Sequence, residues 1–249
     1  MNPFTLLGKT ILITGASSGI GRSTAIHCSK MGATVIATGR NEVRLKEVLA
    51  EMNGAEHQVI CADITNESEI ISLVNSIVSI DGVVLCAGIN DKSLFKQINQ
   101  DKIDKMYHIN IMAPILLLKE IFKKKKITSG ASIVFISSIS SFYATISNAL
   151  YASSKGAINS LIRVLALEYA SKKIRVNGIM PGMVRTDMIN AYGLSEEQMG
   201  DVVKSYPLGR LGEPVDVANG VIYLLSDASC WVTGTNMEGS LYVEIFKCI

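Results

Sequence analysis

The chain has 249 residues, of which 48% are hydrophobic and 18% charged, so it can bury a full core and is near the upper size of one domain. Its formal net charge of +2 is too small for the basic surface typical of nucleic-acid binding, which favours small-molecule chemistry. We therefore expect a single domain over residues 1–249.

Strand and helix patterns alternate along the chain. A strand pattern at 10–14 is followed by glycines and by a helical pattern that contains Ile20, Ala25 and Cys28 and stops at Gly32. Strands follow at 34–38, 58–61, 82–85, 132–136 and 175–179, and helices at 42–52, 67–77, 101–125 and 151–170. The strands are continuously apolar, which predicts burial on both faces and hence a doubly wound, Rossmann-type parallel sheet of α/β class.

The connections between these elements indicate where a ligand binds. Right-handed crossovers place ligands at the carboxyl ends of the strands, at the switch point in strand order. The least regular segment, 186–214, contains short helical patterns between glycines and prolines, and we expect it to form a mobile lid over that site.

The cysteines and the apolar segments bear on cellular location. The five cysteines form no CxxC pair and no zinc spacing, so we expect free thiols in a reducing cytoplasm and no metal site. They are Cys28, Cys61, Cys86, Cys230 and Cys248. The first eight residues do not resemble a signal peptide. The apolar stretch 109–118 is interrupted by Asn110 and Pro114 and is too short to span a membrane.

The turn after the first strand has the composition of a phosphate-binding loop. Gly15 permits a tight turn, and the missing side chains of Gly19 and Gly21 allow a diphosphate and the strand to approach the helix. The start of the helix presents free N–H groups to the phosphates, and Ser17 and Ser18 add hydroxyl donors. A plain glycine-rich turn is the alternative, because such a motif is weak without its strand and helix.

Residues 14–21 match the TGxxxGxG turn of the short-chain dehydrogenases/reductases, and the chain resembles this family along nearly its whole length. Further matches follow in the family's order: Asp63 and Ile64, Ala87 and Gly88, Asn110, Ser138, Tyr151 with Lys155 as YxxxK, and Pro181, Gly182, Val184 and Thr186. The resemblance implies that these residues, with Ile20 and the glycine turn, bind a nicotinamide dinucleotide. Within the family, the chain looks most similar to the 3-oxoacyl carrier-protein reductases.

Carbonyl reduction requires a hydride and a proton, and Tyr151 is the candidate proton donor. Lys155 lies one helical turn further on the same face, where its charge favours the phenolate. Ser138 follows a strand and can donate a hydrogen bond to the substrate oxygen. The resemblance further implies that Lys155 holds the nicotinamide ribose and that Asn110 binds a water that relays protons to Lys155.

Each of these residues also has a structural interpretation. Tyr151 with Lys155 is compatible with a surface pair, and Ser138 with a polar loop. Asn110 is also compatible with an asparagine that bonds its own helix backbone. The lysines at 123–126 suggest docking of an acidic acyl carrier protein, but lysines at a helix end also complement the helix dipole, and we prefer that reading. Taken together, Tyr151, Lys155 and Ser138 favour a catalytic role over these structural interpretations.

The chain departs from the family pattern at two places. Leu85 and Cys86 replace two asparagines, which removes polar bracing beside the cofactor and predicts that Cys86 packs as a small apolar residue. Residues 237–240 arrive about two positions early after Thr233 and Gly234, by comparison with the family pattern. This leaves the register of the last strand, the subunit contacts and part of the substrate pocket open.

The end of the second strand predicts the cofactor. Enzymes specific for NAD usually have a carboxylate there, whereas this chain has Gly39, followed by Arg40. Arg40 offers a planar set of donors for the additional phosphate of NADP, so we expect NADP(H) to be preferred over NAD(H). The alternative is that Arg40 is a solvated charge that pairs with Glu42.

The sequence thus predicts a cytoplasmic, NADPH-dependent carbonyl reductase without nucleic-acid or membrane partners. The leading substrate is a 3-oxoacyl thioester, with acyl carrier protein as a partner, and the alternative is another small ketone such as a keto-sugar. From another class, a catalytically idle dinucleotide-binding sensor remains open, although such a sensor has no need of Tyr151, Lys155 and Ser138. By family resemblance we expect a homotetramer built through helices 101–125 and 151–170, or a dimer.

Overall fold

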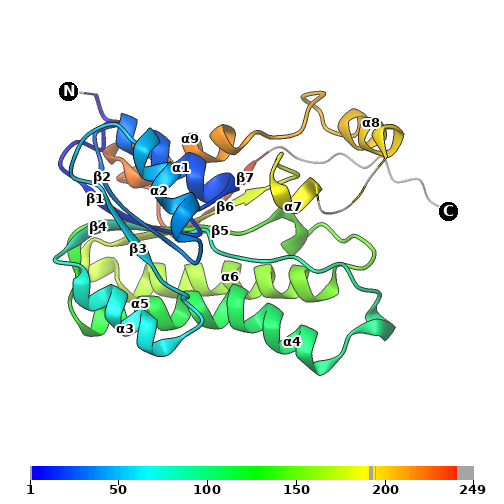
Figure 1. Ribbon diagram of the computed structural model, residues 1–249, viewed down its shortest axis with the longest axis horizontal. Coiled ribbons are helices and arrows are strands. Elements are labelled where there is room, and N and C mark those ends of the chain that lie inside the picture. The colour runs from blue at the N-terminus through cyan, green and yellow to red at the C-terminus, as the bar shows by residue number, and fades with distance from the viewer. Residues whose placement is uncertain (1, 191–192, 194, 240–249) are drawn as a thin grey trace.

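The computed structural model of the protein describes residues 2–190, 193 and 195–239. The described chain forms one seven-stranded sheet in the order β3-β2-β1-β4-β5-β6-β7, with every pair parallel (Figure 1). The strands are β1 (Thr10–Thr14), β2 (Thr34–Gly39), β3 (Gln58–Cys61), β4 (Ile80–Leu85), β5 (Ile127–Ile136), β6 (Arg175–Pro181) and β7 (Asn236–Gly239). This arrangement confirms the predicted doubly wound fold.

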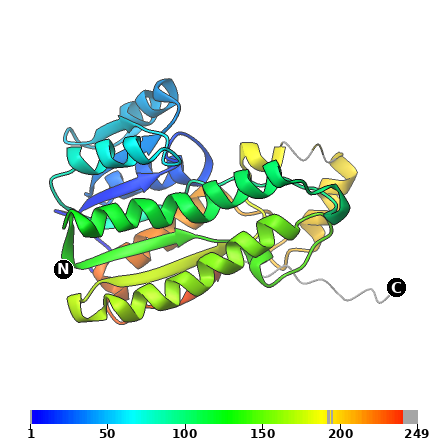
Figure 2. The ribbon, with the colours of Figure 1, turned by 90° about the horizontal axis from the view of Figure 1, so that it is seen from below.

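Helices cover both faces of the sheet. One face carries α1 (Gly19–Lys30), α2 (Glu42–Glu51) and α9 (Pro214–Leu225), and the other carries α3 (Glu67–Ser76), α4 (Gln100–Tyr107), α5 (Ala113–Lys123) and α6 (Ala149–Glu168). Seen from below, the segment α4–α5 and helix α6 run side by side across the sheet (Figure 2). Each face encloses its own apolar cluster, so central strands contribute alternate side chains to two cores.

The edge strand β3 departs from the expectation of burial on both faces. Gln58 and Cys61 are exposed, and Val59 and Ile60 are only half-buried. The reason is position, because β3 pairs only with β2 among the described residues and no further strand covers its outer side. The apolar composition of this strand therefore does not correspond to burial on both of its faces.

The predicted helix 101–125 consists of three segments. The helix α4 continues into a π-helical segment, His108–Met112, before α5 begins. Pro114 lies in the first turn of α5 and lacks an N–H, so it cannot donate to the carbonyl of Asn110 four residues earlier. The wider π-turn accommodates this missing bond, and Asn110 lies buried within it.

After residue 181, the sequence prediction includes a last strand without its bounds and does not include helix α9. The helix α9 begins with Pro214 and has a capping box between Glu213 and Asp216, which is a readable signal of a helix start. The strand β7 pairs with β6 from Gly178 opposite Asn236 onward, which settles the register for its described part. Ser240 and Cys248 lie outside the described residues.

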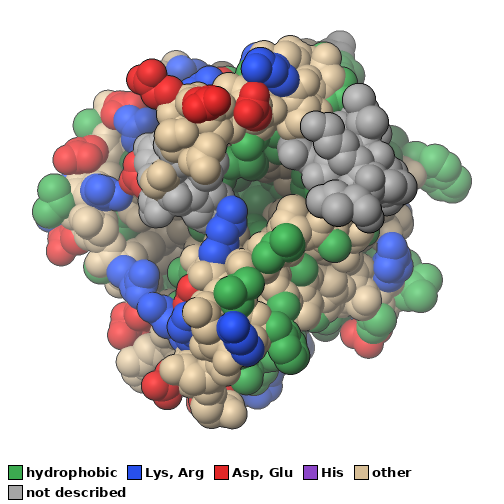
Figure 3. All heavy atoms as spheres, turned by 90° about the vertical axis from the view of Figure 1, so that its right-hand side faces the viewer, with side chains coloured by type: hydrophobic (Ala, Val, Ile, Leu, Met, Phe, Trp, Pro, Cys, Tyr) green, Lys and Arg blue, Asp and Glu red, His purple; other side chains and the backbone are tan. Residues whose placement is uncertain are grey.

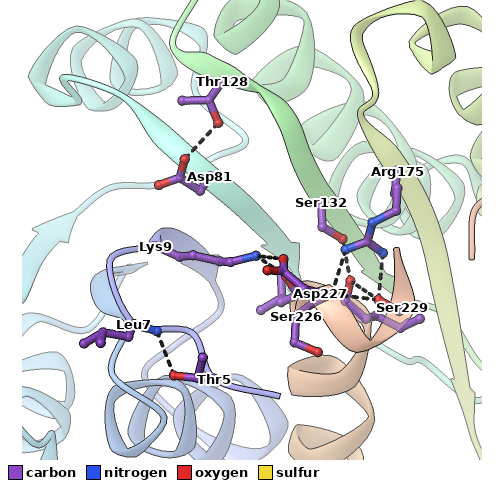
Figure 4. A network of polar contacts seen from close by, with 12 residues as sticks. Thr5, Leu7, Lys9, Asp81, Thr128, Ser132, Arg175, Ser226, Asp227 and Ser229 are labelled. Atoms are coloured by element: carbon purple, nitrogen blue, oxygen red, sulfur yellow. Dashed lines mark hydrogen bonds and ion pairs between the residues drawn. The ribbon is translucent and has the colours of Figure 1, made fainter. Parts of the chain in front are cut away.

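A polar network closes the edge of the sheet at the amino ends of its strands. The half-buried Arg175 guanidinium donates to Ser229 Oγ at 2.8 Å and to the Ser226 carbonyl at 3.2 Å, and Lys9 Nζ pairs with Asp227 at 2.6 Å (Figure 4). Burial lowers the pKa of Arg175. These contacts join β1, β6 and the turn Asp227–Ser229, so this edge is packed while the opposite edge carries the cavity.

Candidate active site

The carboxyl ends of the strands surround a cavity of about 540 Å³. It lies where β1 and β4 are neighbours although β2 and β3 separate them in sequence, which is the switch point of the sheet. Figure 3 looks onto this end of the molecule, where the surface is hollowed near its centre and hydrophobic side chains lie in the hollow. The volume suits a small-molecule ligand.

Almost every site residue expected from the sequence lines this cavity. They are Gly15, Ser17, Ser18, Gly19, Ile20, Gly21, Arg40, Asp63, Ile64, Ala87, Gly88, Ser138, Tyr151, Lys155, Pro181, Gly182, Val184 and Thr186. Asn110 is the exception, because it lies behind the wall of the cavity. The structure therefore brings together residues from both halves of the chain.

The glycine turn is shaped by contacts that exclude side chains. Gly15 has φ 64°, and a Cβ on it would lie 2.9 Å from the backbone of Ala87. A Cβ on Gly21 would lie 2.2 Å from the Gly15 carbonyl oxygen, so the turn requires glycine at both positions. Ser18 begins α1 without a capping bond from its side chain. The turn and the free start of α1 form a cradle that fits the diphosphate of a dinucleotide.

Thr14 braces the turn against the end of β4. Its hydroxyl accepts hydrogen bonds from the backbone N–H groups of Cys86 at 3.1 Å and Ala87 at 3.2 Å. Leu85 is buried, and burial raises the pKa of the Cys86 thiol to about 12, so the thiol stays protonated. The polar contact at this point therefore comes from Thr14 on the neighbouring strand.

Asp63 and Arg40 lie at the far end of the cavity, beyond β2 and β3. Burial raises the pKa of Asp63, but hydrogen bonds from Thr65 and the charge of Arg40 lower it by more, so the carboxylate stays ionised. Arg40 lies 3.9 Å from this carboxylate, and its side chain is 69% exposed. An exposed pair at this distance contributes little to stability, so Arg40 is free to turn toward a ligand.

Asn110 holds the loop that follows β4. Its amide donates to the Ile89 carbonyl at 2.9 Å and accepts from the Ile89 N–H at 2.9 Å, and it also donates to Ser154 Oγ at 3.1 Å. A Cβ on Gly88 would lie 3.3 Å from Asn110 Oδ1 and 3.6 Å from Lys155 Nζ. Asn110 therefore positions the Gly88 loop beside Lys155 through contacts of its own.

Ser138, Tyr151 and Lys155 converge on the substrate side of the cavity. Ser138 follows β5 and begins the short 3-10 turn Ile139–Ser141, where its Oγ accepts from the Ser140 N–H at 3.1 Å. Tyr151 lies in the first turn of α6, and Lys155 Nζ is 5.6 Å from the centre of its ring. The distance places the lysine charge where it acts on the tyrosine.

Lys155 is buried to 6% exposure, and its Nζ donates to the Ile136 carbonyl at 2.8 Å. Burial lowers the pKa of Lys155 to about 8, so its charge is poised near neutral pH. Titrating groups of this kind are common at functional sites.

A network behind Ser138 was not recognised in the sequence. Asn159 accepts a hydrogen bond from Ser137 Oγ at 2.7 Å and donates to Ser141 Oγ at 2.7 Å. Ser141 Oγ in turn donates to the Ser138 carbonyl at 2.7 Å. Asn159 lies one turn after Lys155, and this spacing on α6 was the available signal.

The segment that follows β6, residues 182–206, contributes several of its described residues to one wall of the cavity. Thr186 lies over the glycine turn, since its Cγ2 is 3.1 Å from where a Cβ on Gly19 would be. Tyr206 OH accepts from the Met183 N–H at 2.6 Å and joins the two ends of the segment. It contains the short helices α7 (Asp187–Asn190) and α8 (Glu196–Lys204), as the predicted lid does. Residues 191, 192 and 194 lie outside the described part.

Other residues on the substrate side were also not predicted. They include Ile89, Asn90, Lys92, Ile139, Tyr143, Asn148, Met188, Ile189, Val202 and Tyr206. Most of them lie in loops, where neither period nor motif identifies a pocket residue. Asn148, three residues before Tyr151, had a positional signal because it begins the same helix.

Residues 2–190, 193 and 195–239 contain neither a metal-binding cluster nor a membrane-spanning helix. No group of three or more His, Cys, Asp or Glu side chains is arranged to hold a metal ion. No helix in that part of the chain is sufficiently long and apolar to cross a membrane.

Comparison with known proteins gives consistent matches over most of the chain. A family model described as enoyl-(acyl carrier protein) reductase matches residues 15–238. The 3-oxoacyl-(acyl carrier protein) reductase of Rickettsia felis is 35% identical over 233 residues, covering 94% of this chain and 95% of that protein. L-xylulose reductase of Caenorhabditis elegans is 34% identical over 235 residues, covering 92% and 93%. A solved short-chain type dehydrogenase/reductase from Mycobacterium ulcerans is 32% identical with a TM-score of 0.85, covering 94% of this chain and 89% of that one.

Proposed function

Because this chain belongs to the short-chain dehydrogenase/reductase family, an NAD(P)-dependent group of oxidoreductases for CH–OH and C=O groups, we propose that it reduces a 3-oxoacyl thioester with NADPH. The observation that carries the proposal is the convergence of Ser138, Tyr151 and Lys155 on one cavity with the glycine turn. The similarity to 3-oxoacyl-(acyl carrier protein) reductase supports the substrate class, and acyl carrier protein is the proposed carrier.

The proposed chemistry follows from the positions of these side chains. The nicotinamide supplies a hydride to the carbonyl carbon when it is bound. Tyr151 OH donates a proton to the carbonyl oxygen, and Ser138 Oγ donates a hydrogen bond to the same oxygen. The positive charge of Lys155 stabilises the phenolate that remains on Tyr151. Solvent then returns the proton to Tyr151.

The preference for NADPH rests on the end of β2. Gly39 leaves room beside Ser17, whose Oγ would lie 3.4 Å from a Cβ at this position, and no carboxylate from residue 39 repels a phosphate. Arg40 follows directly and lines the same end of the cavity. A guanidinium matches a phosphate with two parallel hydrogen bonds. These features support NADP(H) over NAD(H).

A second candidate substrate is a small hydroxylated ketone, such as a keto-sugar. The similarity to L-xylulose reductase favours it, and so does a buried amide oxygen of Asn148 at the cavity. This candidate uses the same proton donor and the same cofactor site, so only the part of the cavity beyond Tyr151 distinguishes the two.

The assembly and setting are also proposals. Exposed apolar side chains on α6 and beside α5 support a homotetramer, with a dimer as the alternative. Cys28, Cys61, Cys86 and Cys230 are free thiols, which supports a reducing cytoplasm. We further propose that residues 1–249 form one domain.

The proposed function is tested by measuring cofactor oxidation with 3-oxoacyl thioesters and with hydroxylated ketones. Tyr151→Phe removes the transferable proton and keeps the ring, so turnover should fall by about a hundredfold or more while cofactor affinity is retained. Tyr169→Phe, a tyrosine at the end of the same helix that stacks on Phe122, is the matched control and should keep the wild-type rate.

Three outcomes have different meanings. Turnover that Tyr151→Phe abolishes supports the proposal. A Phe variant with most of the wild-type rate contradicts the role of Tyr151. Tight cofactor binding without turnover of any carbonyl compound contradicts the enzyme proposal and favours the idle dinucleotide-binding sensor.

A further inference from the structure

In the described part of the chain, four helices begin directly after an asparagine. At the start of α2, α3 and α4, the asparagine Oδ1 accepts a backbone N–H from the first turn at 3.0 Å. These residues are Asn41, Asn66 and Asn99, and this contact is the usual helix cap. Asn148 holds the same position before α6, but its side chain makes no capping bond.

The Asn148 oxygen is buried without a partner. The residue is 5% exposed, and Oδ1 has no hydrogen-bond partner within the described chain. A buried acceptor without a donor destabilises a folded protein, and the missing cap adds to this cost. Asn148 lines the cavity, so a bound ligand can supply the missing donor.

The local backbone prevents Asn148 from capping its helix. Asn41, Asn66 and Asn99 have the extended ψ values of 96°, 118° and 172° that a cap requires, whereas Asn148 has ψ 15°. The preceding Ser147 has φ 65°, a left-handed conformation that is strained for a residue with a side chain.

A neighbouring loop holds this strained conformation. The carbonyl of Ser147 accepts the N–H of Ser93 at 2.9 Å, and the Ser93 hydroxyl accepts a hydrogen bond from Lys102 Nζ. Ser93 is 6% exposed, so this contact is shielded from solvent. Strain that the surroundings maintain is typical of functional sites.

Asn148 lies beside the proposed reacting group. It precedes α6, and Tyr151 is the third residue of that helix. Residues three positions apart at a helix, such as these two, are neighbours on its surface. Both line the same cavity together with Ser138. Asn148 and the proposed reacting group therefore face the same ligand.

We propose that Asn148 Oδ1 accepts a hydrogen bond from a hydroxyl group that the substrate carries on the carbon next to its reacting carbonyl. The inference rests on the proposed carbonyl reduction, and of the two candidate substrates it favours the second, a small hydroxylated ketone, over the 3-oxoacyl thioester. A 3-oxoacyl thioester has methylene groups, a carbonyl and a sulfur near its 3-oxo group, none of which is a donor. Asn148 is thus a specificity residue that selects hydroxylated ketones.

The test compares hydroxyacetone with butanone, which differ by a hydroxyl in place of a methyl group. The wild type should have the higher kcat/KM for hydroxyacetone, and Asn148→Ala should reduce this ratio by about tenfold. The hydroxyl also activates the carbonyl, but this effect acts on both proteins alike. The change in the ratio therefore reports the contact with Asn148.

Asn99→Ala is the matched control, because Asn99 begins a helix with an ordinary cap. It should lower the melting temperature and leave the substrate ratio unchanged. Asn148→Ala should show the opposite pattern, with no comparable loss of melting temperature and a changed ratio, since it removes an oxygen that has no partner in the protein.

Calorimetry of the cofactor-loaded protein separates this inference from the proposed function. Propane-1,2-diol should bind more tightly than butan-2-ol to the wild type and equally to Asn148→Ala, even if no ketone is reduced. Equal substrate ratios in both proteins, together with equal diol affinity, would overturn the role of Asn148 and leave carbonyl reduction standing. Weaker cofactor binding by Asn148→Ala would also overturn it, because the donor would then belong to the cofactor.

Discussion

At the scale of single residues, Lys155 is a charged group in a place where burial opposes the charge. Its pKa is lowered from 10.5 to about 8 by that burial. Each pKa unit corresponds to about 1.4 kcal/mol, so the lowered pKa costs the folded protein about 3 kcal/mol at neutral pH. The proposed mechanism requires this charge, which explains why a destabilising residue occupies the position.

We predict that Lys155→Met stabilises the protein at pH 7 by about 1–3 kcal/mol while activity is lost, the lower value allowing for the lost bond to the Ile136 carbonyl. The unfolded chain binds the extra proton between the folded pKa of about 8 and the unfolded value of 10.5. The stability of the wild type relative to the variant should therefore rise as pH increases through this window. Melting temperatures at pH 7 and 10 check both points, and a Met variant less stable than the wild type at pH 7 would contradict them.

Arg40 is the second residue whose role is open to a direct measurement. We predict that Arg40→Ala lowers kcat/KM with NADPH by about tenfold to a hundredfold and leaves kcat/KM with NADH nearly unchanged, since a charge-assisted contact to the phosphate is lost. Arg22→Ala is the control, because Arg22 pairs with Glu51 away from the cavity. A wild type that prefers NADH, or an alanine variant with an intact NADPH preference, would refute the assignment.

At the scale of elements, α6 is joined to the loop after β5 through Asn159. We predict that Asn159→Leu lowers the free energy of unfolding by about 2–3 kcal/mol, because Ser137 and Ser141 lose their partner in the interior. Activity should fall as well, since the Ser138 carbonyl depends on Ser141. Denaturant unfolding measures the loss, and Asn75→Leu on the exposed face of α3 should change stability much less. Equal stability of both variants would show that the network contributes nothing.

At the scale of the whole molecule, the outer surface of α6 and of the neighbouring segment α4–α5 carries exposed apolar side chains. Val164 and Leu167 lie three residues apart on α6 and are 50% and 81% exposed, and Met112 beside α5 is 45% exposed. Helix α6 and the segment α4–α5 lie side by side in Figure 2, so these side chains can form a contact between subunits.

We predict a tetramer, or a dimer, in light scattering at micromolar concentration. Leu167→Lys should shift the mass toward smaller species, because it places a charge in the proposed contact. Val78→Lys is the control, since Val78 is 90% exposed but follows α3. A monomeric wild type would exclude both proposed assemblies.

Local chemistry made much of the fold and the cofactor cradle predictable. The strand Thr10–Thr14 has the predicted bounds, because a short apolar run before a glycine turn leaves little alternative. Gly15 and Gly21 were also recognisable from local chemistry, because a positive φ or a close backbone approach requires glycine. The four-residue spacing of Tyr151 and Lys155 likewise fixes one helical face without knowledge of other elements.

Tertiary contacts decided the remaining features, and each depends on residues distant in sequence. The exposure of β3 follows from its place at the edge, and the role of Asn110 follows from its hydrogen bonds to Ile89 in the loop after β4. The free oxygen of Asn148 exists because Ser93 holds Ser147. Periodicity and spacing describe how a chain is arranged locally, whereas burial and hydrogen-bond partners depend on which segments meet, and packing alone determines that.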